Sequence, residues 1–187
     1  MPQNNQGEYI FECLNFRECK TNSAISILNA IGIGFGGAIA IDIECKVRES
    51  LTARTRNASS MIVKSTDMDE HGLVARCVKD SARTLHFDIP KGKKIVIEID
   101  SAIPIGVGLK SSCSVSTAVV KSVSSLFKDV DSETILEILS HASKASDASI
   151  TGAFDDACAC HLGGLVLTNN SKIQILKHTW IPSQLGE

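Results

Sequence analysis

The sequence is poor in aromatic residues, in net charge and in long apolar runs, and each shortage argues against a class of protein. Aromatic side chains make up 4% of the 187 residues, which leaves little material for stacking nucleic-acid bases. The formal net charge of −2 gives no broad attraction to nucleic acid or to an anionic membrane. No stretch approaches the ~18 consecutive apolar residues that a membrane-spanning helix needs. We therefore expect neither a nucleic-acid partner nor a membrane partner.

The N-terminus also lacks the features of a secretion signal. Residues 1–8 have neither a basic start nor an apolar core, so we expect the chain to remain in the cytoplasm. The seven cysteines are an odd number and lie mostly among apolar neighbours, as reduced and buried thiols do. A hydrophobic content of 43% is typical of a globular protein, and the length suits one good-sized domain or one domain plus the beginning of another.

The hydrophobic pattern predicts a mixed α+β domain. It predicts a helix or compact turn starting near Ser23 and a helix after Ser112, where Val115, Val119 and Val123 recur at helical spacing. Residues 79–87 are ambiguous between helix and loop. Strands are expected over 8–16, 38–47, 60–65, 72–78, 94–100, 165–168 and 172–178, and further helices over 131–146 and from 153.

The segment 103–114, Ile-Pro-Ile-Gly-Val-Gly-Leu-Lys-Ser-Ser-Cys-Ser, lies between an expected strand and an expected helix. Glycines allow backbone N–H groups to approach an anion, and a helix start adds unpaired N–H groups and a partial positive charge. Lys110 adds a full charge, while Ser111 and Ser112 supply hydroxyls that can cap the helix or meet a phosphate-bound Mg²⁺. Taken alone, the segment is equally an ordinary capped turn into a core helix.

A second segment, Thr151-Gly152 followed by Asp155 and Asp156, predicts a helix with two carboxylates in its first turn. Such a carboxylate is stabilised as the anion, which suits a general base. Adjacent helix positions point about 100° apart, so the two groups cannot both face one ligand. The plain alternative is that both residues balance the helix dipole. Together, however, a basic loop and an acidic one supply the two halves of a phosphoryl-transfer site.

Three other motifs are rejected. Residues 32–37 match G-x-G-x-x-G, but a dinucleotide site needs a strand before the glycines and a helix after them, and here the expected order is reversed. No G-x-x-x-x-G-K-[ST] occurs, which argues against a P-loop kinase. A metal site formed by Cys158, Cys160 and His161 lacks a partner motif, and buried thiols are the preferred interpretation.

These segments carry a resemblance to a known family. The pattern Pro104-x-x-x-Gly108-Leu109-Lys110-Ser111-Ser112 resembles the phosphate-binding motif of the GHMP kinases, which include galactokinase, homoserine kinase and mevalonate kinase. The lysine before the serines, the segment Ser149–Ala157 and the segment Ser23–Ala30 with the glycines and Asp42 after it resemble the archaeal-type shikimate kinase branch. The match runs from Ser23 to about Thr168.

The resemblance implies ATP- and Mg²⁺-dependent phosphorylation of a shikimate hydroxyl, which gives shikimate 3-phosphate and ADP on the route to chorismate and the aromatic amino acids. It implies a fold like domain 2 of ribosomal protein S5, with a left-handed βαβ crossover, over residues 1–180. Asp155 takes the position of the catalytic aspartate, with Asp156 beside it. The resemblance also implies a Mg²⁺/phosphate serine at Ser112, acceptor-side residues at Ser23 and Asn29, and ATP-phosphate contacts at Pro104, Gly106, Gly108, Leu109, Lys110 and Ser111.

The sequence departs from the family at two places. Phe35 stands where this branch is expected to carry lysine. The glycine-rich third motif of the ferredoxin-like C-terminal domain is missing, and residues 181–187 are interpreted as the start of that domain. Three alternatives follow: a shikimate kinase, another GHMP small-molecule kinase of the homoserine or mevalonate type, or a non-catalytic nucleotide-binding fragment that needs a missing C-terminal segment or chain.

Overall fold

The structure is a computed structural model that describes residues 13–53, 60–64, 72–145 and 153–181. Its centre is a six-stranded sheet in which the long strand β2 (Phe35–Ala53) pairs with three neighbours. β1 (Cys13–Leu28) runs antiparallel along one side of β2. On the other side, β4 (Lys93–Ser101) pairs with the second half of β2, and β5 (Leu165–Asn169) pairs with its first residues.

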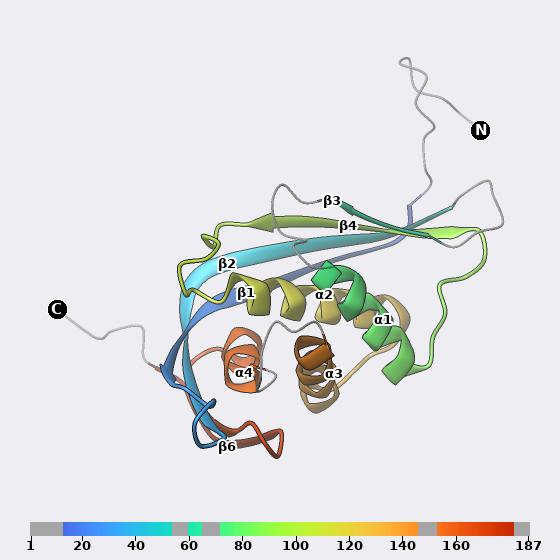
Figure 1. Cartoon of the computed structure of the whole chain (residues 1–187). Helices are drawn as coiled ribbons and strands as arrows, with labels where there is room; N and C mark the ends of the chain where they lie inside the picture. The colour runs from blue at the N-terminus through green and yellow to red at the C-terminus, as the bar shows by residue number, and fades with distance from the viewer. Residues whose placement is uncertain (1–12, 54–59, 65–71, 146–152, 182–187) are drawn as a thin grey trace.

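The remaining strands lie at the two ends of this arrangement. β3 (Ser60–Lys64) runs parallel to β4, and α1 (Leu73–Leu85) connects them, so this part of the chain is a βαβ unit. β6 (Gln174–Thr179) forms an antiparallel hairpin with β5. The pairing of β1 with β2 is irregular between Asn22 and Ser23, where β2 contributes extra residues. Such bulges bend strands, and both strands curve around the helices at this end (Figure 1).

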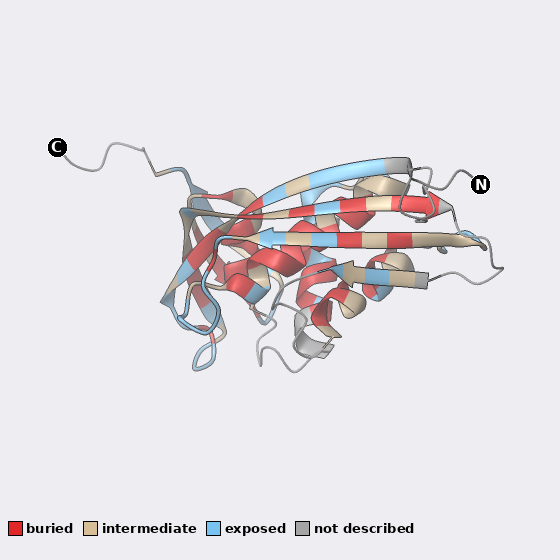
Figure 2. Cartoon of the chain, turned by 90° about the horizontal axis from the view of Figure 1, so that it is seen from above, coloured by how far each residue is buried: buried red, intermediate tan, exposed pale blue. Residues whose placement is uncertain are grey.

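The other helices are α2 (Ser111–Phe127), α3 (Ser132–Ala145) and α4 (Phe154–Leu162). The four helices of the described residues lie on the same side of the sheet, with α2 and α4 against β1 and β2 (Figure 1). Buried and more exposed residues alternate along β2 and β4 (Figure 2), as expected for a sheet with one covered face. Val115, Val119 and Val123 of α2 are fully buried, which confirms the predicted helix face.

Two predicted elements are wrong. The segment from Ser23 is not a helix or compact turn, because β1 continues through it to Leu28. Residues 72–78 are not a strand but the first part of α1, which buries Leu73, Val74 and Cys77 at helical spacing. Of the strand expected over 8–16, residues 13–16 belong to β1, which continues to Leu28, and the strand expected over 38–47 is longer, from Phe35 to Ala53. The remaining strands and helices are confirmed within a few residues of their expected bounds, although residues 8–12, 65–71 and 146–152 lie outside the described part.

Candidate active site

The loop before α2 has the backbone that its glycines predict. Gly106 and Gly108 have φ angles of 75° and 83°, and Lys110 has a φ of 56° as the residue that precedes the helix. A left-handed φ is unusual for a lysine, because its Cβ crowds the backbone there. Left-handed residues within a turn let N–H groups point into a shared concavity, which is a geometry suited to anions. This loop therefore presents N–H groups and the start of α2 to one space.

A cavity of about 280 Å³ lies at this loop. It is lined by Gly108, Leu109, Lys110, Ser111, Ser112, Cys113, Ala153 and Asp156. Ser111 is buried, with 7% of its surface exposed, whereas Ser112 is exposed. Of the two serines, Ser112 therefore presents its hydroxyl more openly to a ligand at the helix start.

The loop and the first turn of α4 meet in an ion pair. Lys110 Nζ lies 2.8 Å from Asp156 Oδ2, with 29% of the lysine side chain and 7% of the aspartate side chain exposed. The other carboxylate oxygen, Asp156 Oδ1, accepts a hydrogen bond of 2.8 Å from the hydroxyl of Ser26 in β1. Three segments far apart in sequence thus converge on one carboxylate.

Asp155 points to different partners. Its Oδ1 accepts a hydrogen bond of 2.8 Å from the side-chain amide of Asn170, which directly follows β5. Its carboxyl group also rests against the backbone of Gly36 in β2, where an added Cβ would lie 2.6 Å from Asp155 Cγ. Asp155 is 4% exposed and Asp156 is 5% exposed, so both carboxyl groups are largely removed from solvent.

Burial and the neighbouring charges shift the ionisation of the Lys110–Asp156 pair. The pKa of Asp156 is raised, first by burial and then by the charge of Asp155, although Lys110 and Ser26 lower it in part. For Lys110, burial is the largest influence and lowers the pKa, but the hydrogen bond and charge of Asp156 outweigh it, so the pKa is raised. The lysine is therefore a cation at neutral pH, paired with Asp156.

The inner face of β1 supports the loop. Ser23 donates a hydrogen bond to the carbonyl oxygen of Leu109, and Thr21 contacts both the carbonyl and the hydroxyl of Ser114 at 2.9 Å. Asn29 lies apart from this region, in the turn after β1, where its Oδ1 accepts a hydrogen bond from the N–H of Ile31. Pro104 and Gly106 are exposed residues of the loop that do not line the cavity.

Sequence reasoning missed three residues of this region: Ser26, Gly36 and Asn170. Ser26 lies inside the segment expected to be near the acceptor, but nothing in the sequence distinguishes it from its neighbours. Gly36 belongs to the rejected dinucleotide pattern, and its closeness to Asp155 depends on a contact across 119 positions. Asn170 stands in the run Thr168-Asn169-Asn170-Ser171, which reads as turn chemistry.

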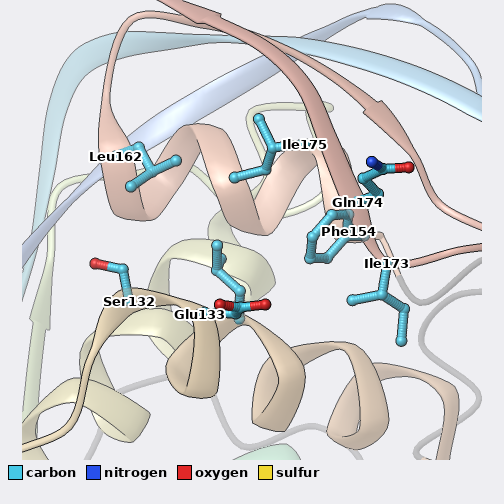
Figure 3. A pocket seen from close by; sticks show the side chains of 8 residues that line it. Ser132, Glu133, Phe154, Leu162, Ile173, Gln174 and Ile175 are labelled. Carbon is cyan, nitrogen blue, oxygen red and sulfur yellow. The ribbon is translucent and has the colours of Figure 1, made fainter.

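A second cavity, of about 390 Å³, lies between α3, α4 and β6 (Figure 3). Phe154, Leu162, Ile173 and Ile175 line it, and Glu133 supplies its single charged group. Phe154, directly before Asp155, is 2% exposed and points into this space (Figure 3), which anchors the start of α4. The cavity contains none of the predicted site residues, so we place the candidate active site at the smaller cavity.

The described residues contain neither a cluster of metal-ligating side chains nor a membrane-spanning helix. Among residues 13–53, 60–64, 72–145 and 153–181, no group of three or more His, Cys, Asp or Glu side chains could hold a metal ion. Cys158 and Cys160 are buried, and burial raises the pKa of both thiols. None of the described helices is long and apolar enough to cross a membrane.

The fold and the site define a class of protein: an α+β domain in which a loop with glycines and a lysine, at the start of a helix, meets a buried carboxylate at a cavity. Comparison with known proteins gives the family. Residues 72–164 match the family described as GHMP kinases N terminal domain, and the chain belongs to the GHMP kinase family. The α+β fold expected from the sequence is thereby confirmed.

Among curated proteins, the chain is 34% identical over 158 residues to a shikimate kinase of Pyrococcus abyssi, covering 84% of this chain and 56% of that protein. It is 32% identical over 163 residues to a shikimate kinase of Methanothrix thermoacetophila, covering 87% of this chain and 54% of that protein. The chain thus spans little more than half the length of these relatives.

Solved structures of this family share the fold. The mevalonate kinase of Methanococcus jannaschii matches with a TM-score of 0.68 at 18% identity, covering 89% of this chain and 56% of that one. The homoserine kinase of Cytophaga hutchinsonii matches with a TM-score of 0.67 at 17% identity, covering 91% and 54%. At these identities the likeness concerns the fold alone.

Proposed function

We propose that this chain is the nucleotide- and acceptor-binding part of a shikimate kinase, which transfers the γ-phosphate of ATP to a shikimate hydroxyl. The observation that carries the proposal is the meeting of the loop at Lys110 with Asp156 of α4 at one cavity, with Asp155 next to Asp156 in the first turn of the helix. The identity of 34% with an archaeal shikimate kinase supports shikimate over the other acceptors of the family.

In this proposal the loop holds the phosphates of ATP. Backbone N–H groups between Gly106 and Ser112 and the start of α2 would face the negative oxygens, and Lys110 would add its charge. Pro104 and Leu109 would shape the loop, and Ser111 would secure the helix start. Because the loop and helix are already in place, binding would require little reorganisation of the backbone.

The oxygens at the cavity suit magnesium. Mg²⁺ prefers hard oxygen ligands and often binds through one or two protein groups together with substrate phosphates. The hydroxyl of Ser112 and the carboxylate of Asp156 both line the cavity, so they would hold the ion together with the nucleotide. When bound, the ion would neutralise charge that develops on the transferring phosphoryl group.

Asp155 is proposed to orient and deprotonate the acceptor hydroxyl. Its carboxylate is fixed by Asn170 and by contact with Gly36, so it is aimed without needing to reorganise during the reaction. Asp156, paired with Lys110, is better placed to serve the nucleotide. Ser23 and Asn29 stay predictions for the acceptor side.

An activity assay tests this function. The full chain with Mg·ATP should release ADP with shikimate but not with homoserine, mevalonate or galactose. If the chain alone is inactive, the same assay is run on a chimera that continues it with the C-terminal part of the Pyrococcus abyssi relative. ADP release with another of these acceptors and none with shikimate would assign the protein to a different acceptor.

A second candidate is a nucleotide-binding module without activity of its own. It is favoured by one observation: the chain spans 56% of the length of its Pyrococcus abyssi relative. This module would bind Mg·ATP in a calorimetric titration but release no ADP with any acceptor, either alone or as the chimera. Turnover by the chimera alone would instead mean that the kinase needs a further segment or chain.

A further inference from the structure

Asn170 is a buried residue that the proposed mechanism does not assign to either substrate. It directly follows β5 and is 1% exposed. Its backbone N–H donates a hydrogen bond of 2.8 Å to the carbonyl oxygen of Gly34, so its main chain is fixed to the beginning of the β2 region. Both the oxygen and the nitrogen of its side-chain amide are also hydrogen-bonded, so the side chain is fixed beside Asp155.

The hydrogen bonds around Asn170 have one consistent direction. Thr168 Oγ1 donates to Asn170 Oδ1 at 2.6 Å, and Asn170 Nδ2 donates to Asp155 Oδ1 at 2.8 Å. An ionised carboxylate only accepts hydrogen bonds, so the amide must turn its nitrogen toward Asp155 and its oxygen toward Thr168. Thr168, which is fully buried, must then donate its proton to that oxygen.

We propose that Asn170, itself oriented by Thr168, is a positioning residue that aims the Asp155 carboxylate at the acceptor hydroxyl. The proposal rests on the proposed function, because it concerns the same aspartate. Without the amide of Asn170, the Asp155 carboxylate would lose the hydrogen bond that fixes its orientation.

Steady-state kinetics test the proposal on the full chain, or on the chimera if only that protein turns over. Asn170→Ala should lower kcat roughly 10²-fold while the KM for ATP changes less than about twofold, because the aim of the base is lost and the nucleotide loop is intact. Thr168→Val should also lower kcat with the KM for ATP kept, and Thr168→Ser, which keeps the hydroxyl, should restore kcat.

Asn169→Ala is the matched control. Asn169 precedes Asn170 in the chain, but its side chain accepts a hydrogen bond from the N–H of Lys172 instead of contacting Asp155. Its kcat should equal that of the unaltered protein. A kcat of Asn170→Ala that is lowered only in proportion to the loss of folded protein would overturn the proposal.

A measurement that needs no turnover separates this inference from the proposed function. In an ¹⁵N-labelled chain, the side-chain amide resonances of Asn170 should shift in Asp155→Ala and in Thr168→Val, because both partners contact this amide. Asn169→Ala should leave these resonances unchanged. If the shifts are seen but no acceptor is phosphorylated, the proposed function fails while the contact stands; resonances that do not respond to Asp155→Ala overturn the positioning role whatever the activity.

Discussion

Gly36 shows how one missing methyl group shapes the candidate site. A Cβ at this position would lie 2.6 Å from Cγ and 2.7 Å from Oδ2 of Asp155, closer than such atoms approach one another. We therefore expect Gly36→Ala to displace the Asp155 carboxylate and to lower kcat roughly 10²-fold. The measurement is kcat at saturating shikimate and Mg·ATP, with urea denaturation to confirm that the variant folds.

Gly32→Ala is the control for this change. Gly32 lies nearby in the turn between β1 and β2, but a Cβ there would meet nothing within 4 Å. Its activity should equal that of the unaltered chain. Equal activity of the Gly36 variant would mean that Asp155 is free to shift, which contradicts a role that depends on its aim.

The ion pair of Lys110 with Asp156 competes with any bound phosphate. Asp156→Asn removes a negative charge from the cavity and releases the lysine, while the amide oxygen can still accept the hydrogen bond from Ser26. We expect this variant to bind ADP about tenfold more tightly in the presence of EDTA, which is about 1.4 kcal/mol. Isothermal titration calorimetry measures the affinity.

The double variant Lys110→Met/Asp156→Asn provides the matching control. It should lose the gain in affinity, because the released cation is what the phosphates would bind. With Mg²⁺ added, the unaltered chain should bind ADP more tightly than Asp156→Asn, since Asp156 is proposed to serve the ion. If Asp156→Asn and the double variant bind ADP with the same affinity without Mg²⁺, Lys110 does not meet the phosphates.

At the scale of elements, hydrophobic periodicity predicts most of the fold but misleads at β1. There the large side chains of Ile25 and Ile27 are exposed, whereas Thr21, Ser23 and Ala24 are buried. The covered face of this strand has small and hydroxyl-bearing residues because α2 and α4 approach it and because the hydroxyls bond to the loop and to Asp156. When the apolar residues of this segment are assumed to be the buried ones, the pattern does not indicate a strand, and a helix or compact turn is predicted instead.

Some residues of the candidate site can be predicted from a local sequence pattern. The segments at Lys110 and Asp155 can be found in this way, because glycine, lysine and acidic residues next to the start of a helix are a recognisable pattern. Asn170 and Gly36 act only through contacts that the whole fold creates. No local pattern distinguishes them from turn residues, so the structure is needed to find them.

Glu49 of β2 is an acidic residue that is buried between the sheet and α2. It is fully buried, and neither carboxylate oxygen has a hydrogen-bond partner in the described part of the chain. Burial raises its pKa well above the usual value, and nearby Ser122 opposes this only in part. The side chain is therefore protonated in the folded protein at pH values where it ionises in the unfolded chain.

The sign of the pH dependence follows. Below the unfolded pKa of about 4.3 both states are protonated, and as the pH rises toward the folded pKa the unfolded chain gains stability relative to the fold. Glu49→Gln should remove this loss, so its advantage in unfolding free energy should grow by up to about 1.4 kcal/mol per pH unit in that window. Urea denaturation at pH 4.5 and pH 8 measures the difference.

Glu98→Gln is the comparison for Glu49→Gln. Glu98 lies on the surface of β4, where it pairs with Lys64 at 2.9 Å and its side chain is 49% exposed. The change should alter stability by less than about 1 kcal/mol at either pH. If Glu49→Gln gains no more from pH 4.5 to pH 8 than Glu98→Gln does, then Glu49 is ionised inside the fold.

On the scale of the whole molecule, large apolar side chains gather at the curved end of the sheet. Ile31, Ile33 and Trp180 are 62%, 68% and 72% exposed, and further members of this set are Ile25, Ile27, Leu28, Phe35 and Leu176. Exposed apolar groups of this size often mark a surface that contacts another protein. The set lies on β1, the turn after it, β2, β6 and the residue that follows β6.

A dye that binds exposed apolar surface tests this patch. Ile31→Ser/Ile33→Ser should lower the fluorescence of bound anilinonaphthalene sulfonate by about half, because the two most exposed isoleucines of the turn are lost. Ile62→Ser on β3, which removes an isoleucine that is 40% exposed elsewhere on the sheet, should have little effect. Equal dye binding by all three proteins would mean that the isoleucines do not form one apolar surface.

The candidate site draws Ser26, Gly36, Lys110, Asp156 and Asn170 from β1, β2, the loop before α2, α4 and the turn after β5, and non-covalent contacts join these segments. A ligand bound at this site therefore contacts or lies next to segments from most of the described chain, so it stabilises the folded state as a whole. Its binding adds to the cost of melting the fold, by about 2.7 kcal/mol at a concentration of 100 times its Kd. A thermal-shift screen of hydroxylated ring acids with ADP would thus reveal the favoured acceptor before a single turnover is recorded.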